Sequence, residues 1–156
     1  MSSLKERVDD FLAQKRIAVA GVSRQSKNEA ANFIYRKLRD SGYQVFPVNP
    51  NATTVEDTTC YPDLKSLPMA VDGVVIVTPP QVTEQLVREC ADLGIPRVWI
   101  HRSMGQGSVS KSASEFCHEH HIAVISGGCP MMFCAPVDFG HKCMGWITRL
   151  TGGMRG

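Results

Sequence analysis

The sequence lacks long apolar runs and carries little net charge. No hydrophobic segment approaches the roughly 18 residues that a membrane-spanning helix needs, and the N-terminal stretch MSSLKERVDDFLAQKR has no apolar core of the kind found in secretory signals. A net charge of +2 is too small to indicate nucleic-acid binding by itself. We therefore expect a cytoplasmic protein that binds neither a membrane nor a nucleic acid, and we expect its six cysteines to be reduced thiols.

The chain alternates strand-like and helix-like segments. Its 156 residues, 43% of them hydrophobic and 21% charged, have the size and composition of one globular domain. Short apolar stretches such as RIAVAGV, GVVIVTPP and IAVISGG are typical of buried strands, and amphipathic stretches lie between them. This alternation predicts an α/β fold: a Rossmann-like, doubly wound, mainly parallel five-stranded sheet with helices on both faces.

We expect one domain over residues 1–156. Its core should extend over about residues 15–128, and residues 129–156 should wrap the sheet edge and end in a short helix. Residues 51–68, between the second and third strands, should form an irregular crossover with one helical turn near Asp63. Pro47, within the second strand, cannot donate a ladder hydrogen bond and therefore favours a place near the sheet edge.

Two predicted helices have clear inward faces. In the helix at residues 29–42, the apolar pattern places four side chains inward: Ala30, Phe33, Ile34 and Leu38. In the helix at residues 81–94, the same pattern selects Val82, Leu86, Cys90 and Leu93. Cys90, like Cys117 on a later helix, is therefore predicted to be a small buried hydrophobe.

Ligands of such a sheet bind beyond the carboxyl ends of its strands. Five stretches of the sequence fall there, and all are rich in small residues, prolines and hydroxyls: GVSRQSK, VNPN, TPPQVT, HRSMGQGS and SGGCPM. Glycines let a ligand approach the backbone closely, and Arg24, Lys27 and Arg102 are cations suited to phosphates. Turns after strands often contain such residues singly, but five such turns together indicate a ligand site.

The stretch KRIAVAGVSRQSKNEAANFI is typical of a strand, a loop with one glycine and a helix. Free N–H groups at the start of a helix attract anions. A dinucleotide fingerprint needs three glycines and an acid about twenty residues further on. The loop here has only Gly21, and the second strand ends in Val48, Asn49 and Pro50 without a carboxylate. A site for NAD or ADP-ribose is therefore the weaker alternative, whereas we still expect this loop to bind a phosphate.

The order AVAGVSR…K, VFPVNPN, YPDL, VVIVTPP and VWIH…G resembles that of the CoA-binding domain family. It is also similar, more distantly, to the N-terminal domain of the succinyl-CoA synthetase alpha subunit, and the likeness covers residues 5 to 130. The resemblance implies CoA or an acyl-CoA as ligand, with its phosphates at the first loop and with later loops beside the adenine and the pantetheine arm. The implied site residues are Gly21, Val22, Ser23, Arg24, Lys27, Asn49, Pro50, Thr78, Pro79, Pro80, His101, Ser103, Gly105 and Gly107.

Two features depart from the family pattern. Many small members have a W-M-Q-x-G type sequence at the end of the fourth strand, where this chain reads VWIHRSMGQGS. His101 thus stands in the place of the glutamine. The tail GGCPMMFCAPVDFGHKCMGW also differs from the short ending that is usual in the family. Both departures indicate a distinct subgroup.

No catalytic set can be assigned from the sequence. The synthetase relative uses a phosphorylated histidine in a second domain, and we expect no second domain here. No acid can be paired with His101, so a structural role is favoured for it over a catalytic one. We therefore predict a CoA-binding protein and no enzyme. Its partner is a CoA-type small molecule, and a homo-oligomer is compatible with the sequence.

A metal or thiol-redox module is the alternative function. It would use a set of thiols and an imidazole near the end of the chain: Cys129, Cys134, His141 and Cys143. Thiolate and imidazole groups are zinc ligands, but the spacings C-x4-C and H-x-C differ from the usual C-x2-C knuckle. The sequence MMF between the first two cysteines also resembles core, so a structural role is favoured for this set.

Overall fold

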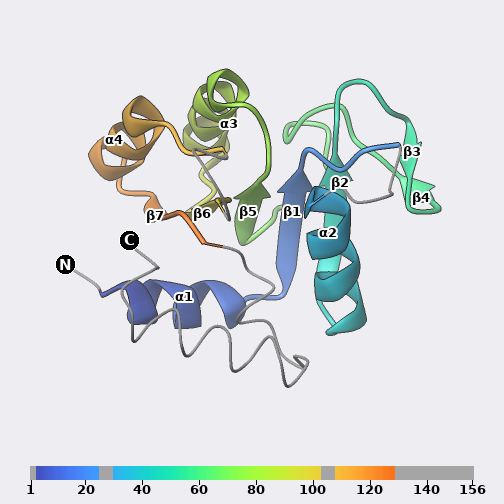
Figure 1. Cartoon of the computed structure of the whole chain (residues 1–156), viewed down its shortest axis with the longest axis horizontal. Helices are drawn as coiled ribbons and strands as arrows, with labels where there is room; N and C mark the ends of the chain where they lie inside the picture. The colour runs from blue at the N-terminus through green and yellow to red at the C-terminus, as the bar shows by residue number, and fades with distance from the viewer. Residues whose placement is uncertain (1–2, 25–29, 103–107, 129–156) are drawn as a thin grey trace.

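The computed structural model describes residues 3–24, 30–102 and 108–128, which form a parallel sheet covered by helices (Figure 1). The sheet contains five strands, in the spatial order β2 (Gln44–Val48), β1 (Arg16–Ala20), β5 (Gly73–Ile76), β6 (Arg97–Ile100) and β7 (Ala123–Ser126). Every neighbouring pair is parallel. The predicted Rossmann-like, doubly wound sheet is therefore confirmed, and Pro47 lies on the edge strand β2, as expected.

Helices cover both faces of the sheet. α1 (Leu4–Leu12) and α2 (Ala30–Asp40) pack on one face, and α3 (Pro80–Leu93) and α4 (Lys111–Glu119) pack on the other. Because side chains alternate along a strand, the two faces have separate cores. Val19, Val75 and Trp99 face α1 and α2, whereas Val74 and Ile76 face α3 and α4. Burial on both faces explains why the strands are almost continuously apolar in sequence.

Local sequence signals mark the ends of the helices. Ser3 caps α1, because its hydroxyl accepts a hydrogen bond from the Glu6 N–H and the Glu6 carboxylate accepts one from the Ser3 N–H. α3 begins at Pro80, where a missing N–H costs nothing. It ends at Gly94, which has a φ of 73°. In the ranges that the structure describes, no helix is long and apolar enough to cross a membrane.

The inward face of α2 differs from the predicted one. Ala30 and Phe33 are exposed, and this part of the prediction is wrong. Ala31 and Tyr35 are buried in their place, together with the fully buried amide of Asn32. A pattern that counts only apolar residues misses the buried face of α2, because that face includes a polar residue. Asn32 can be buried because its amide is hydrogen-bonded.

The inward face of α3 is displaced in a similar way. Leu86 and Cys90 are buried as predicted, but Val82 and Leu93 are 36% and 43% exposed. Thr83 is fully buried instead, and its hydroxyl donates to the Ser108 carbonyl oxygen at 2.8 Å. The two exposed apolar side chains of α3 border the cavity described below.

The crossover between β2 and β5 contains a hairpin that the sequence did not indicate. β3 (Thr54–Val55) pairs antiparallel with β4 (Thr58–Thr59). The two residues between them, Glu56 and Asp57, have φ values of 48° and 61°, as a two-residue type I′ turn requires. The helical turn expected near Asp63 is wrong: there the Asp63 carboxylate accepts hydrogen bonds from the N–H and hydroxyl of Ser66 in a simple turn.

Candidate functional site

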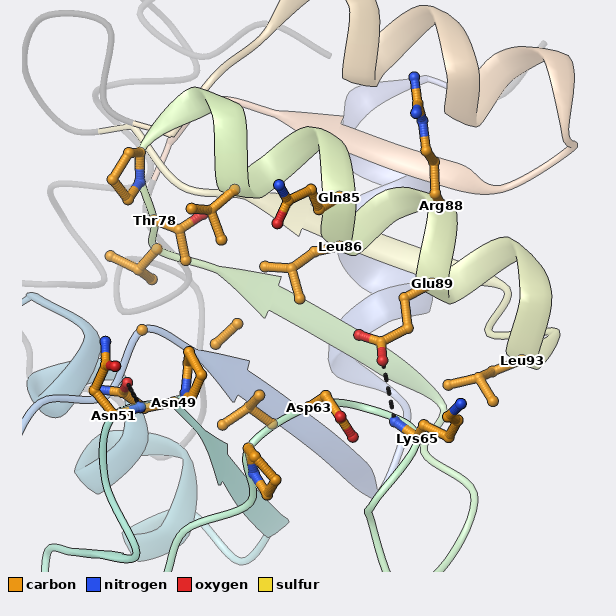
Figure 2. Close-up of a pocket in the computed structure, with 18 of the residues that line it drawn as sticks. Asn49, Asn51, Asp63, Lys65, Thr78, Gln85, Leu86, Arg88, Glu89 and Leu93 are labelled. Carbon is orange, nitrogen blue, oxygen red and sulfur yellow. Dashed lines mark hydrogen bonds between the residues drawn. The ribbon is translucent and has the colours of Figure 1, made fainter.

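A cavity of about 1010 Å³ lies at the carboxyl ends of β1 and β5 (Figure 2). The chain leaves β1 for β2 on one side and returns to β5 on the other, so the strand order reverses between these two neighbours. Ligands of open α/β sheets bind in the crevice at such a reversal. The volume is at the upper end of the range for small-molecule sites, so the cavity suits a large ligand.

α3 forms one wall of the cavity, and the segments that follow β2 form the other. Figure 2 shows Leu86 and Glu89 pointing from α3 toward the side that carries Asn49 and Asp63. Five of the residues implied by the sequence line this cavity: Gly21, Asn49, Pro50, Thr78 and Pro79. They come from the ends of three different strands, which the parallel sheet brings to one edge.

Gly21 lies at the floor of the cavity, directly after β1. Its φ is +104°, a conformation that L side chains rarely adopt. A Cβ at this position would lie 2.0 Å from the Val77 carbonyl oxygen at the end of β5. The Gly21 N–H donates to the Val48 carbonyl oxygen at 2.9 Å. Position 21 therefore strongly favours glycine, because the loop after β1 passes between the ends of β2 and β5.

The rest of the described first loop is clamped by a buried amide. Asn32, in the first turn of α2, accepts a hydrogen bond from the Ser23 N–H at 2.9 Å. Its own amide donates to the Ser23 carbonyl oxygen, also at 2.9 Å. Both backbone groups of Ser23 are thus satisfied by one side chain, as in a strand ladder. The N–H groups of Gly21 and Ser23 are therefore committed to protein acceptors, and the shape of this loop is set before any ligand binds.

Asn49 supports the first loop from the side of β2. Its amide nitrogen donates to the Val22 carbonyl oxygen at 2.9 Å, and its amide oxygen accepts from the Asn51 N–H at 2.9 Å. The second bond is a local side-chain turn of the kind that asparagine favours. Asn49 lines the cavity, but its polar atoms are used to join two loops.

The third loop is also fixed by hydrogen bonds. The Thr78 N–H donates to the hydroxyl of the buried Ser108 at 2.8 Å, and the Thr78 and Thr83 hydroxyls are 3.1 Å apart. Pro79 is the residue before α3, and no side-chain hydrogen bond caps the helix there. Ser108 and Thr83 were not expected from the sequence, since single hydroxyls in a turn or helix carry no distinctive pattern.

At the end of the cavity away from the first loop, charged residues of α3 face the segment that follows β4. The Glu89 carboxylate accepts hydrogen bonds from the N–H groups of Leu64 and Lys65, each at 3.3 Å, and Figure 2 shows the second of them. Asp63 and Asp92 also line this end. No sequence motif indicates this wall, because its residues lie away from the loops at the strand ends.

Apolar side chains line the middle of the cavity. Val48 at the end of β2 and Leu86 of α3 belong to one apolar cluster, and both line the cavity together with Val82. The exposed fraction of Val82, 36%, faces this cavity. The sequence does not distinguish Val82 from the buried residues of α3, because Val82 lies on the same apolar pattern as Leu86 and Cys90.

The other implied residues of the described chain are not among those that line the cavity. Val22 is fully buried, Ser23 and Pro80 are half-buried, and Arg24 is exposed. His101 is buried at the end of β6, and burial lowers the pKa of its imidazole below the ordinary value of 6.5. The imidazole is therefore neutral at pH 7.

Several predicted positions lie outside the described residues. Among the implied site residues these are Lys27, Ser103, Gly105 and Gly107. The alternative metal or redox set also lies there, namely Cys129, Cys134, His141 and Cys143, together with the rest of residues 129–156. Within residues 3–24, 30–102 and 108–128, no group of three or more metal-binding side chains could hold a metal ion.

Two cysteines of the helices behave as the sequence predicts. Cys90 of α3 and Cys117 of α4 are fully buried free thiols within one apolar cluster. Burial raises the pKa of Cys117 to about 12 and raises that of Cys90 as well. Both thiols are therefore protonated at neutral pH, and both fill space as small hydrophobes.

Known proteins share both the sequence pattern and the fold. The alpha subunit of an ADP-forming acetate–CoA ligase II from Pyrococcus furiosus is 28% identical over 130 residues, which are 78% of this chain and 28% of that subunit. An ADP-forming acetate–CoA ligase II from Archaeoglobus fulgidus is 33% identical over 88 residues, 55% of this chain and 13% of that protein. The chain thus spans less than a third of the length of either curated relative.

The fold is shared with a solved structure, and the sequence matches a family model. A hypothetical protein from Pyrococcus horikoshii superposes with a TM-score of 0.74 at 27% identity, over 81% of this chain and 86% of that one. The model of the CoA binding domain family matches residues 15–135, which is most of the chain and includes all the strands of the sheet. The resemblance seen in the sequence is confirmed, and the chain belongs to the CoA-binding domain family.

Proposed function

We propose that the chain binds CoA or an acyl-CoA in the cavity between β1 and β5 and serves as a binding module. The observation that carries this proposal is the cavity of about 1010 Å³ at the strand reversal of a CoA-binding domain family member. CoA is a long polyanion with a diphosphate, a ribose phosphate and a flexible arm of amides and methylenes. It needs a long site with a cationic end and an apolar middle.

The phosphates would lie at the first loop, beside Arg24 and the start of α2. N–H groups and the dipole at a helix start favour anions, and Arg24 is exposed at this end. Lys27 would add a second cation. Because Asn32 and Asn49 already fix the loop, little conformational entropy would be lost when a phosphate binds.

The apolar middle of the cavity would accommodate the adenine or the pantetheine arm. Val48, Val82 and Leu86 provide apolar surface there, and Gln85 is a polar neighbour on α3. Few polar groups on a mostly apolar wall are typical of small-molecule sites.

The end of β2 favours CoA over NAD. A dinucleotide site places a carboxylate at this strand end, where it binds the ribose hydroxyls. Here β2 ends at Val48, and the next side chain, Asn49, donates to the Val22 carbonyl oxygen. The acids that line the cavity, Asp63, Glu89 and Asp92, come from a later segment and from α3.

We assign no catalytic step to the chain. By name, the two curated relatives are ligases, and this chain corresponds to only 28% and 13% of their lengths. We propose that the chain contributes CoA binding and that the chemistry of such ligases requires the parts it does not match. For His101, buried and neutral at the end of β6, we propose a structural role.

Calorimetric titration with CoA tests the proposal, with NAD and ADP-ribose as comparators. We expect a Kd of about micromolar or tighter for CoA, and a rise in the free energy of unfolding of about 2.7 kcal/mol at a CoA concentration one hundred times Kd. Titration with a short acyl-CoA then asks whether an acyl group strengthens binding. Stabilisation by NAD with none by CoA would show the proposal to be wrong.

A further inference from the structure

The turn of the β3–β4 hairpin contains a buried glutamate, Glu56. Glu56 and Asp57 occupy the two central positions of its turn, with φ values of 48° and 61°. Asparagine and glycine are the residues that favour such positions, and a glutamate there is uncommon. The Glu56 side chain is nevertheless only 9% exposed. A buried carboxylate in an unfavourable turn indicates that its contacts offset the cost of the conformation.

Those contacts lead to the first loop of the cavity. One oxygen of the Glu56 carboxylate accepts hydrogen bonds from the Asn32 amide and from the Arg36 guanidinium, both at 2.8 Å. Asn32 is the fully buried residue that binds both backbone groups of Ser23. The chain of contacts therefore runs from the hairpin through α2 to the loop.

The carboxylate determines which way the Asn32 amide points. A carboxylate can only accept hydrogen bonds, so the –NH2 end of Asn32 must face Glu56. Both of its protons are then used, one on Glu56 and one on the Ser23 carbonyl oxygen. The amide oxygen remains for the Ser23 N–H at 2.9 Å. Without Glu56, the buried amide would lose this constraint, and one of its protons would lack a partner.

We propose that Glu56 is a positioning residue for the ligand site: through Asn32 it fixes the backbone of Ser23 and thereby the loop that receives the phosphates of CoA. Arg36 neutralises the charge of Glu56, because its guanidinium lies on the same carboxylate oxygen. The hairpin, which lies in the crossover between β2 and β5, does not line the cavity but supports the loop that does, through Asn32. The inference rests on the proposed function for its binding measurement, and on loop geometry alone for a second measurement.

The test compares Glu56→Asn with Asp57→Asn. Asparagine is favoured at both positions of the turn, so each variant keeps the hairpin and removes one carboxylate from it. Only the first removes the contact with Asn32, because the asparagine side chain is one methylene shorter. We expect Glu56→Asn to weaken CoA binding by roughly tenfold or more, and Asp57→Asn to change it by less than about twofold. Glu56→Gln retains an acceptor for Asn32, so we expect its affinity to lie between the two.

Amide hydrogen exchange provides the readout that does not depend on CoA. In Glu56→Asn we expect the Ser23 N–H to exchange roughly tenfold faster or more, while the buried strand amide of Val75 keeps its rate. Equal acceleration of both amides, or unchanged protection of Ser23, would overturn the inference. If the wild-type chain did not bind CoA, the proposed function would be refuted. The exchange rate of the Ser23 N–H would still decide the role of Glu56.

Discussion

Gly21 and Val77 are in contact through the backbone: a Cβ on residue 21 would lie 2.0 Å from the Val77 carbonyl oxygen. The contact joins the loop after β1 to the end of β5, the two strands between which the strand order reverses. Gly21 and Val77 both line the cavity, so this close approach of the two backbones fixes its shape at the ends of β1 and β5.

Replacing Gly21 by alanine should strongly destabilise the fold. The variant must accommodate both a positive φ and a clash with a carbonyl oxygen, and we expect the free energy of unfolding to fall by about 2–5 kcal/mol. Gly42→Ala is the matched control, because Gly42 has a φ of +97° and nothing lies within 4 Å of an added Cβ. That variant should lose only about 1–2 kcal/mol. Urea unfolding measures both, and equal losses would contradict the clash.

Removing the cations of the first loop should weaken CoA binding and reduce its dependence on salt. We expect Arg24→Ala combined with Lys27→Ala to lose roughly a hundredfold in affinity, because each charge-assisted contact with a phosphate contributes about 1.5–3 kcal/mol. Lys5→Ala serves as control, since Lys5 pairs with Asp9 on α1, away from the cavity. Calorimetry at two salt concentrations checks the prediction. Unchanged affinity in the double variant would refute the phosphate assignment.

A charge on the apolar wall should impair binding without affecting the core. Val82 lines the cavity and is 36% exposed, so Val82→Asp should alter the free energy of unfolding by less than about 0.5 kcal/mol. Negative charge beside a polyanion should nevertheless weaken CoA binding by roughly tenfold or more. Met69→Asp is the matched control, because Met69 is an exposed apolar residue that does not line the cavity. If both variants bound CoA equally well, the ligand would not contact α3.

Acid should destabilise the fold through His101. Burial lowers the pKa of His101 in the folded state, so the unfolded chain binds a proton more readily, and the free energy of unfolding falls as pH drops below about 6.5. His101→Gln removes the titrating group and should reduce this acid-side loss. Urea unfolding at pH 7.5 and pH 5.5 measures the difference. Equal acid-side losses in the wild type and in His101→Gln would contradict the prediction.

Much of the fold could be predicted because strands buried on both faces are uniformly apolar. RIAVA and GVVI follow this rule, and both form central strands. The faces of the helices were harder to assign, because Asn32 and Thr83 are polar residues that hydrogen bonds allow to be buried. The hairpin at Glu56 and Asp57 could not be predicted either, because its turn lacks the asparagine and glycine that are typical of a two-residue hairpin turn.

The sequence by itself determined the order of strands and helices, the single glycine after β1 and the family pattern, since each of these depends on residues close together in the chain. Only the tertiary structure decided which side chains surround the cavity and which support it. Glu89 reaches Leu64 across 25 positions, and Glu56 reaches Asn32 across 24. Such contacts arise because strand order and helix rotation bring distant residues together, and local propensities carry no information about either.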